Sequence, residues 1–446
     1  MATPISVSFH TLGCKLNFAE TSTIKQQFEA AGYHVNPFEE GADICVINTC
    51  SVTDFADRKC RKVVRQALNK NRDSKIVVVG CYAQLKPNEI ADIEGVDLVL
   101  GAAEKFNILS YIDRLDKTPG KGWVKASDIS ALDTFSSAFS FGDRTRSFLK
   151  IQDGCDYNCS FCTIPQARGK SRNDTIGQVL KTAELIAQKG IKEIVLTGVN
   201  IGDFRDQSAD GSTPLLLRDL LKSLDREASV PRLRISSIEP NLCSDEIIDF
   251  VARSTTIMPH FHMPLQSGND KQLAKMRRRY RRSLYADRIN RIRSQMPHAC
   301  IGADVIVGFP GESRDDFLVT KQFLSELDVN YLHVFTYSER ANTLAATMQD
   351  AVPLHVRRTR NEELRDLSSR KQRLFYTRHM GTISEVLLEK SRKPNWYNGF
   401  TENYIKVEIE HSPGLKINSI QPLLLDSLKD SGVMQARADL EIHAGS

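Results

Sequence analysis

The sequence predicts an α/β protein with three consecutive parts: an N-terminal parallel sheet flanked by helices, a central α/β barrel, and a small antiparallel β-barrel. Short apolar runs alternate with helical stretches over the first hundred residues, which is typical of a parallel sheet. Six further strand–helix repeats follow at intervals that favour an α/β barrel, complete or partial. After about Gly381 the chain changes to β-type residues joined by turn-rich segments, which indicates the small barrel.

Length and composition exclude several classes of protein. The 446 residues correspond to about three domains. Hydrophobic residues make up 41% and charged residues 26%, which excludes a largely disordered chain. No apolar run approaches the roughly 20 residues of a membrane span, and residues 1–9 lack the basic and apolar regions of a secretory signal. We therefore expect a cytoplasmic protein that does not associate with membranes.

Residues 1–116 form the predicted N-terminal domain. Its strands are expected at Val7–Leu12, Ile44–Asn48, Lys75–Val79 and Val96–Leu100, and its helices at about Ala19–Ala31, Ala56–Asn71 and Pro87–Ile93. Residues 117–140 are rich in Ser, Gly and Asp and are interpreted as a linker.

Residues 141–378 form the predicted α/β barrel. Its strands are expected to begin near Ser147, Glu193, Arg232, His260, Ile301 and Tyr331, with helices at Thr175–Lys189, Leu215–Asp225 and Arg314–Leu327. Residues 353–379 are charged and helical. Residues 379–446 form the predicted small barrel, in which Ile383–Leu388 and Tyr404–Ile409 have strand character and Asn398-Gly399 is interpreted as a turn.

Three cysteines at the start of the predicted barrel carry the strongest chemical signal. Cys155, Cys159 and Cys162 form a C-x3-C-x2-C pattern in a loop that follows the first barrel strand. Three thiolates can bind one soft metal centre. A structural zinc site needs four protein ligands. A metal bound by only these three thiolates would therefore keep one coordination position open. The alternative is a zinc knuckle whose fourth ligand lies elsewhere in the chain.

Three other cysteines occupy equivalent positions in the N-terminal domain. Cys14, Cys50 and Cys81 each lie just past the carboxyl end of a predicted parallel strand. These ends share one edge of the sheet, where ligands of open α/β sheets bind, so we expect a second metal centre there. The alternative is three unconnected buried cysteines. The other four cysteines are interpreted as core or incidental residues: Cys45, Cys60, Cys243 and Cys300.

The segment 155–162, with Phe161 before its last cysteine, resembles the radical S-adenosylmethionine superfamily. The two cysteine triads, in this order, resemble the methylthiotransferase branch of that superfamily over nearly the whole chain. Further matching positions are Pro165, Arg168, Gly169, Arg172, the segments 196–200, 234–239, 263–268, 276–280 and 304–312, and, in the tail, Gly381, Val386, Leu388, Glu389, Gly399, Thr401, Asn403, Tyr404 and Val407.

The resemblance implies a partial (β/α)6 radical SAM barrel, a TRAM-like RNA-binding tail and two 4Fe-4S clusters. Cys155, Cys159 and Cys162 would hold the cluster that binds S-adenosyl-L-methionine, which serves as methyl donor and radical source. The auxiliary cluster, on Cys14, Cys50 and Cys81, would deliver the sulfur. A reductase or flavodoxin-like electron donor and a sulfur source are the further partners implied. No residue is predicted to be a general acid or base.

The substrate type is indicated by the segment 11–17, Thr-Leu-Gly-Cys-Lys-Leu-Asn. It is similar to the type that methylthiolates carbon 2 of threonylcarbamoyladenosine at position 37 of tRNA. The sibling that acts on isopentenyladenosine usually has Gln-Met in place of Lys15-Leu16, and the sibling that acts on a ribosomal-protein aspartate has Pro-Lys. Both siblings remain alternatives, and a non-catalytic, zinc-carrying RNA-binding protein is a more distant one.

By the same resemblance, five residues would bind S-adenosylmethionine: Asn200, Glu239, Gln266, Ser267 and Gly308. Ordinary barrel loops with turn glycines are the alternative. His260 and His262 alternate along one strand and are interpreted as packed structural residues.

Two basic segments could contact the anticodon loop of tRNA, which is the expected macromolecular partner. Met276–Arg293 holds eight arginines and one acid, which suits either phosphate binding or a solvated helix face. The tail places Lys390, Arg392 and Lys393 beside Trp396, Tyr397 and Phe400, a mixture that suits RNA phosphates and unstacked bases.

Overall fold

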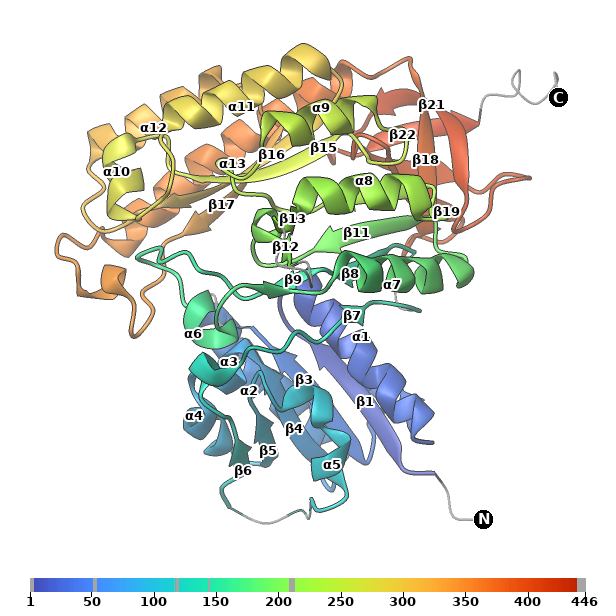
Figure 1. The fold of residues 1–446 in the computed structure, drawn as a ribbon, viewed down its shortest axis with the longest axis vertical. Helices are drawn as coiled ribbons and strands as arrows, with labels where there is room; N and C mark the ends of the chain where they lie inside the picture. The colour runs from blue at the N-terminus through green and yellow to red at the C-terminus, as the bar shows by residue number, and fades with distance from the viewer. Residues whose placement is uncertain are drawn as a thin grey trace.

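The computed structural model describes residues 4–50, 54–115, 117, 120–142, 145–207 and 213–438, except for the side chains of residues 54–57. Figure 1 shows the N-terminal sheet (blue) at the bottom, the barrel strands and their helices (green to orange) above it, and the C-terminal barrel (red) to one side. None of the described helices is long and apolar enough to cross a membrane.

The N-terminal sheet has six parallel strands in the order β2-β1-β3-β4-β5-β6. The strands are β1 (Ser6–Thr11), β2 (His34–Asn36), β3 (Ile44–Thr49), β4 (Lys75–Gly80), β5 (Val96–Leu100) and β6 (Trp123–Lys125). The helices are α1 (Lys15–Ala30), α2 (Asp54–Lys70), α3 (Cys81–Leu85), α4 (Pro87–Ala91) and α5 (Leu109–Ile112). The four predicted strands are confirmed to within one residue at each end. The two strands not predicted, β2 and β6, have three residues each.

Neighbouring residues of the central strands face two separate apolar cores. Val46 packs in the core that contains Phe28 of α1, whereas the next residue, Ile47, packs in the core that contains Val64 of α2. A strand that is buried on both faces is apolar at every position rather than at alternate ones. This is why the four strands are easily recognised in the sequence.

The barrel consists of six parallel strands that follow one another in chain order. They are β8 (Ser147–Lys150), β11 (Glu193–Thr197), β14 (Arg232–Ile235), β15 (His260–Gln266), β16 (Cys300–Val307) and β17 (Tyr331–Thr336). Isolated bridges, Leu233–Ile257 and Ser237–His262, join the first three strands to the last three. Within the described residues no ladder joins β8 to β17, so this is the predicted partial (β/α)6 barrel.

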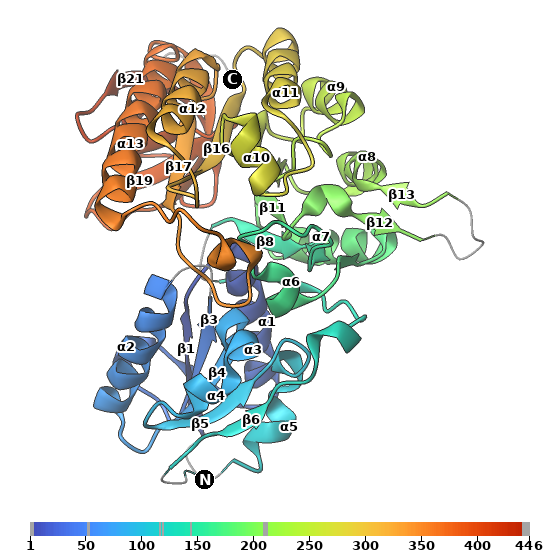
Figure 2. The ribbon, with the colours of Figure 1, turned by 90° about the vertical axis from the view of Figure 1, so that its left-hand side faces the viewer.

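Helices cover the outside of these strands (Figure 2). They are α7 (Ile176–Gln188), α8 (Leu217–Glu227), α9 (Asp245–Arg253), α11 (Arg282–Gln295), α12 (Arg314–Glu326) and α13 (Leu354–Thr377). The charged segment 353–379 is thus a single helix, as predicted.

The predicted linker contributes a strand to each neighbouring sheet. β6 extends the N-terminal sheet beyond β5, and β7 (Ala138–Phe139) pairs antiparallel with β8 of the barrel. Phe139 N donates to Thr23 Oγ1 at 3.2 Å, and Phe141 N donates to Ser22 Oγ at 2.9 Å. The connection is therefore hydrogen-bonded to α1 as well as to the barrel.

The C-terminal part is a closed barrel with the strand order β18-β19-β20-β22-β21, consistent with a TRAM domain. The strands are β18 (Ile383–Lys390), β19 (Trp396–Thr401), β20 (Lys406–Glu410), β21 (Ile420–Leu428) and β22 (Met434–Ala438). All neighbours are antiparallel except β20 and β22.

The prediction of a turn at Asn398-Gly399 is wrong. Both residues lie within β19, opposite Glu389 and Leu388 of β18. Gly399 is needed there for packing, because a Cβ would lie 2.7 Å from the carbonyl oxygen of Leu387. The connection between β18 and β19 instead spans residues 391–395.

Two buried arginines fix the C-terminal barrel to the central one. Arg234 binds the Glu193 carboxylate through two hydrogen bonds of 2.8 and 3.1 Å, and it also donates to Glu402 O at 3.0 Å. Arg232 donates to Glu385 O at 2.7 Å. Because a buried guanidinium is costly unless its donors are satisfied, these bonds define how the two barrels pack.

We expect Gly80→Ala to destabilise the N-terminal sheet more than Gly32→Ala does. Both glycines have positive φ, +101° and +86°. A Cβ at Gly80 would contact the Thr49 backbone and the Asn48 side chain, whereas a Cβ at Gly32 would meet nothing within 4 Å. Backbone strain alone costs about 1 kcal/mol, and strain with overpacking costs about 2–4 kcal/mol. Urea unfolding midpoints of the two variants compare these costs, and equal midpoints would contradict the packing argument.

Candidate active site

The three barrel cysteines lie in one loop between β9 (Gln152–Asp153) and α6 (Ile164–Arg168). Cys155 N donates to Gly169 O at 3.1 Å, which closes the base of the loop. All three side chains are partly buried. Burial raises the pKa of Cys155 to about 11 and that of Cys162 to about 12. The loop therefore holds three neighbouring sulfur atoms at the carboxyl end of the first barrel strand.

Arg278 contacts this loop, although the sequence pattern did not single it out. Its Nη1 donates to Cys159 Sγ at 3.1 Å, and its Nη2 is ion-paired with Glu239. Arg278 belongs to the arginine-rich segment that suits either phosphate binding or a solvated helix face. The structure shows that this arginine is buried, with its charge directed at a cysteine and a carboxylate.

The three cysteines of the N-terminal domain lie at the same edge of its sheet. Cys14 caps α1, Cys50 follows β3 and Cys81 begins α3. A Cβ on Gly13 would lie 3.3 Å from Cys50 Sγ, so the turn that carries Cys14 packs directly against Cys50. Burial raises the pKa of Cys81, and the neighbouring Cys14 contributes to this rise. The expected convergence of these strand ends is therefore observed.

Asn17 ties the strand ends beneath this triad together. Its Nδ2 donates to Leu12 O at 2.8 Å and to Thr49 O at 3.0 Å, so one side chain bridges the ends of β1 and β3. Its Oδ1 accepts a hydrogen bond of 2.8 Å from Arg168 Nη2, which belongs to the barrel. The amide therefore links the two parts of the chain that carry cysteine triads.

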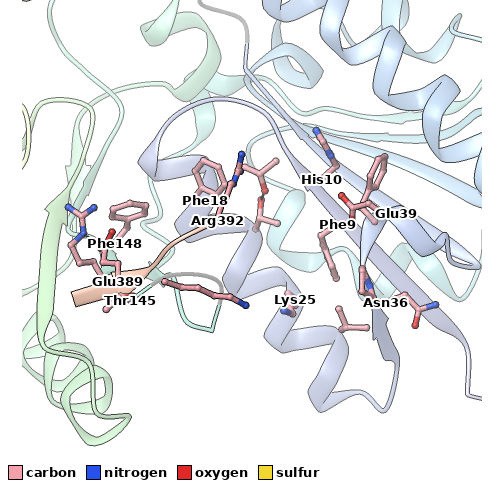
Figure 3. A pocket seen from close by; sticks show the side chains of 17 residues that line it. Phe9, His10, Phe18, Lys25, Asn36, Glu39, Thr145, Phe148, Glu389 and Arg392 are labelled. Atoms are coloured by element: carbon pink, nitrogen blue, oxygen red, sulfur yellow. Dashed lines mark hydrogen bonds and ion pairs between the residues drawn. The ribbon is translucent and has the colours of Figure 1, made fainter. Parts of the chain in front are cut away.

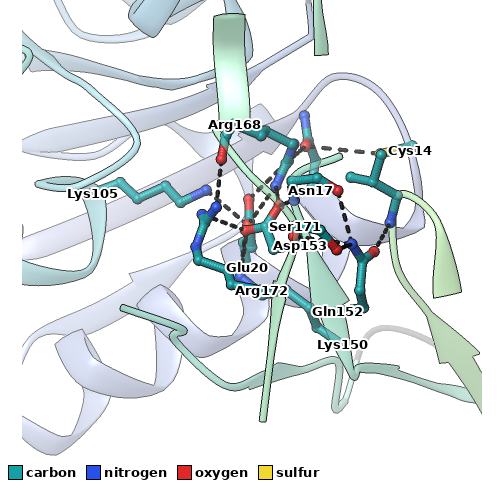
Figure 4. Close-up of polar contacts among 12 residues, drawn as sticks. Cys14, Asn17, Glu20, Lys105, Lys150, Gln152, Asp153, Arg168, Ser171 and Arg172 are labelled. Carbon is teal, nitrogen blue, oxygen red and sulfur yellow. Dashed lines mark hydrogen bonds and ion pairs between the residues drawn. The ribbon is translucent and has the colours of Figure 1, made fainter. Parts of the chain in front are cut away.

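A buried ionic network joins the two parts around Arg168 (Figure 4). Glu20 of α1 accepts ion pairs from Lys105 at 2.7 Å, Arg168 at 2.9 Å and Lys150 at 3.2 Å. Asp153 is the second carboxylate of the network. It pairs with Arg168 at 2.9 Å, Lys150 at 3.0 Å and Arg172 at 3.3 Å.

This network has more positive than negative charge. Four cations, Lys105, Lys150, Arg168 and Arg172, surround only two carboxylates, which leaves two positive charges. Burial alone would raise the pKa of Glu20, but Arg168, Lys105 and Lys150 outweigh that effect and lower it. Cys81 and Cys14 lie close enough to Arg168 to raise the pKa of its guanidinium. The excess positive charge therefore lies beside the N-terminal cysteines, where thiolates would balance it.

A cavity of about 500 Å³ lies between the N-terminal domain and the interior of the barrel. Its wall includes Cys14 and Lys15, the ends of the barrel strands, and Tyr404 of the C-terminal barrel. All three parts of the chain therefore contribute to one cavity.

His262, one of the two histidines predicted to be structural, forms a hydrogen-bonded group with Asp304 and His333 in the cavity wall. His262 Nε2 lies 2.9 Å from Asp304 Oδ1, and His333 Nδ1 lies 3.2 Å from the same atom. Burial alone would raise the pKa of Asp304, but the hydrogen bonds from both histidines outweigh that effect and lower it. His260 is buried and its Nε2 lies 3.0 Å from the Tyr331 hydroxyl.

A second cavity, of about 250 Å³, opens beside the barrel cysteines. Its wall includes Cys162, Gln266 and Phe335, and Phe335 also lines the larger cavity. Gln266 has a φ of +67°, and its Oε1 is buried with no hydrogen-bond partner among the described residues. An unsatisfied buried amide in a strained backbone conformation is typical of a ligand-binding position.

The other predicted S-adenosylmethionine ligands differ in their surroundings. Both side-chain polar atoms of Asn200 are buried without a partner in the described chain. Glu239 is ion-paired with Arg278, as described above. The Ser267 hydroxyl lies 3.1 Å from Thr320 Oγ1, and Gly308 N donates to Glu312 Oε2 at 2.6 Å. Asn200 and Gln266 therefore have unused hydrogen-bonding groups, whereas Ser267 and Gly308 bond to neighbouring protein groups.

A groove of about 780 Å³ runs between the N-terminal sheet and β18 of the C-terminal barrel (Figure 3). The aromatic side chains that line the groove are Phe9, His10, Phe18 and Phe148. The cationic side chains that line it are Lys25, Arg146, Lys390 and Arg392. The two tail cations Lys390 and Arg392 thus face this groove. Trp396 lies elsewhere, with Lys393 Nζ 3.5 Å and Lys429 Nζ 4.1 Å from its ring centroid.

Most of the arginine-rich segment is engaged in the protein's own contacts. Arg288 pairs with Asp245, Arg291 with Asp249 and Arg293 with Asp328. Arg279 lies over the ring of Tyr157, 3.9 Å from its centroid. These contacts, together with those of Arg278, favour a structural role for most of the segment.

Two parts of the chain match known protein families. Residues 6–101, which contain the N-terminal cysteine triad, match the Uncharacterized protein family UPF0004. Residues 149–324, which contain the barrel triad, match the Radical SAM superfamily.

Known proteins are similar over most of the chain. Threonylcarbamoyladenosine tRNA methylthiotransferase MtaB of Bacillus subtilis is 41% identical over 411 residues, covering 90% of each protein. The protein of the same name from Aquifex aeolicus is 35% identical and covers 91% of this chain and 97% of its own. The radical S-adenosylmethionine methyltransferase TsrM of Kitasatospora setae, solved with cobalamin and a [4Fe-4S] cluster, has a TM-score of 0.55 at 14% identity, over 77% of each chain.

We expect Glu20→Gln to destabilise the contact between the N-terminal domain and the barrel by about 3–5 kcal/mol at neutral pH, because it leaves buried cations unpaired. Glu20 has a lowered pKa in the folded protein. Its stabilising contribution is therefore present above the unfolded pKa and lost as the pH falls through the folded value. Denaturation at several pH values should show a deficit that shrinks in acid.

The matched control is Glu29→Gln, at an exposed position on the same helix. Its effect should stay within about 0.5 kcal/mol. A Glu20→Gln deficit no larger than that of the control, or one independent of pH, would contradict the role given to the ionic network.

Proposed function

The chain belongs to the MtaB-type radical S-adenosylmethionine methylthiotransferases, which are tRNA-modifying enzymes, and from this we propose that it methylthiolates carbon 2 of threonylcarbamoyladenosine at position 37 of tRNA. The observation that carries the proposal is that one cysteine of each triad lines one of two adjacent cavities. Cys14 lines the larger cavity, Cys162 lines the smaller, and Phe335 lines both.

The residues present fit two iron–sulfur clusters. Each triad offers three thiol ligands, and thiolates are the ligands of such clusters. The two unbalanced positive charges of the buried network, beside Cys14 and Cys81, suit an anionic thiolate centre. In this proposal Cys14, Cys50 and Cys81 hold the auxiliary cluster, and Cys155, Cys159 and Cys162 hold the cluster that binds S-adenosylmethionine.

When bound, the clusters and S-adenosylmethionine supply the radical and sulfur-transfer chemistry that an unactivated C–H bond requires. The protein's own residues position the reactants. The unsatisfied amides of Asn200 and Gln266 are suited to bind S-adenosylmethionine. Carbon 2 of an adenine carries a C–H bond that is not acidic, so the proposal needs no general base.

The tRNA is proposed to bind along the groove between β18 and the N-terminal sheet. Lys25, Lys390 and Arg392 can neutralise phosphates there, and the aromatic wall can stack with unpaired bases. The target base must leave the stack to reach an interior cavity. Arg146 and Phe148 line both the groove and the larger cavity, which makes the two spaces adjacent.

The reaction consumes electrons and adds a sulfur atom to the product. The proposal therefore includes a reductase or flavodoxin-like electron donor and a separate sulfur source. It also includes a cytoplasmic location, since that is where the tRNA substrate would be met.

Deletion of the protein is expected to abolish the methylthiolated form of threonylcarbamoyladenosine in tRNA and to leave the precursor nucleoside in its place. Nucleoside mass spectrometry of total tRNA measures both forms. Loss of methylthiolated isopentenyladenosine instead would show that the substrate is that of the sibling enzyme.

Mutations in the two cysteine triads should have different effects on activity. Cys50→Ala removes one ligand of the proposed auxiliary cluster, so the anaerobically purified variant should contain about half the iron. It should still release deoxyadenosine from S-adenosylmethionine but yield no methylthiolated tRNA. Cys159→Ala should abolish deoxyadenosine release.

Cys45→Ala provides the control, since Cys45 is buried within the same sheet but lies inside β3 rather than at its end. It should keep the wild-type iron content. Full methylthiolation by Cys50→Ala would mean that the N-terminal cysteines are structural.

A further inference from the structure

One lysine of the larger cavity has no ion-pair partner among the described residues. Lys15 is the first residue of α1, directly after Cys14, and its accessible side chain lines the cavity. Within the described part of the chain it makes no ion pair shorter than 4 Å.

The other charged residues of the cavity wall are paired. Arg234 is bound by Glu193, and Arg146 pairs with Glu389 at 2.8 Å. Asp304 accepts hydrogen bonds from two histidines, as described above. The wall therefore carries one ammonium group without an ion-pair partner close to two guanidinium groups, while its one carboxylate, Asp304, is held by two histidines; an anion can bind at the ammonium group.

The same cavity contains buried polar atoms without partners. Ser236 Oγ and His260 Nδ1 have no hydrogen-bond partner among the described residues, and these side chains are only 5% and 4% exposed. Buried polar groups are normally hydrogen-bonded. The cavity therefore suits a ligand that carries both an anion and neutral hydrogen-bonding groups, and it suits a hydrocarbon substituent poorly.

Resting on the proposed function, we propose that Lys15 determines substrate specificity by binding the carboxylate of the threonylcarbamoyl group on the target adenosine. That substituent has one carboxylate, together with amide and hydroxyl groups that Ser236 and His260 can satisfy. An isopentenyl substituent has none of these groups. A site built from hydrogen-bonding groups rejects an analogue that leaves them unpaired.

Two other anions could use the same lysine. S-adenosylmethionine has a carboxylate, and a thiolate cluster at the neighbouring Cys14 is itself anionic. Both are cofactors rather than the substrate base, so measurements that vary only the tRNA substituent distinguish them.

The test compares Lys15→Gln and Lys15→Arg with wild type on two tRNAs under anaerobic conditions. One tRNA carries threonylcarbamoyladenosine, and in the other the carboxylate of that substituent has been coupled to methylamine to give an amide. A charged hydrogen bond is worth roughly tenfold to a hundredfold in kcat/KM. The kcat/KM of the wild-type enzyme should be lower by that factor on the amide tRNA than on the natural tRNA, mainly because KM rises.

The kcat/KM of Lys15→Gln on the natural tRNA should be lower than that of wild type by the same factor. Its kcat/KM on the amide tRNA should be no lower than on the natural tRNA. Lys15→Arg should recover most of the activity, because it keeps the charge. The control is Lys181→Gln, an exposed position on α7, which should match wild type on both tRNAs.

The outcomes separate the inference from the function on which it rests. Equal losses by Lys15→Gln on the two tRNAs would overturn the carboxylate contact. A raised KM for S-adenosylmethionine, or a lowered iron content, would overturn it in favour of one of the cofactor anions. Absence of product from wild type on the natural tRNA would instead overturn the proposed function itself.

Discussion

The arrangement of the whole molecule depends on the charges buried between the N-terminal sheet and the barrel. Glu20 and Asp153 are inaccessible to water, so each must be surrounded by donors or destabilise the fold. Arg168 contacts both carboxylates and also Asn17, which ties together the strand ends beside Cys14 and Cys50. One guanidinium thereby links the two loops that carry the cysteine triads.

The same network explains why the positive charge is not fully neutralised within the protein. A buried cluster with four cations and two carboxylates would be unfavourable if no further anion lay nearby. Cys81 and Cys14 are the adjacent groups that can become anionic, and they would do so as ligands of the proposed auxiliary cluster. In that proposal, the stability of the domain contact and the binding of the cluster depend on a single set of residues.

Features that depend on the local sequence pattern were predictable, and features that depend on side-chain contacts between distant residues were not. The central strands and both cysteine triads were predictable, because burial on two faces makes a strand continuously apolar and parallel strands share one functional edge. The partners of Glu20 were not, because Lys105, Lys150 and Arg168 come together only through the fold. The Asn398-Gly399 pair predicts a turn, but Gly399 serves close packing within β19. The arginine-rich pattern suits either phosphate binding or a solvated helix face, but Arg278 is buried and contacts Cys159.

The position of Lys15 shows how one scaffold can serve different substrates. Helix α1 begins there, so the backbone is fixed by Cys14 and Asn17 on either side, while the Lys15 side chain projects into the cavity. A substitution at this position alters the charge of the cavity wall without removing a proposed cluster ligand or a member of the buried network. In the proposal made above, a cation at the first residue of α1 favours an anionic substituent on the target base, and a neutral side chain does not.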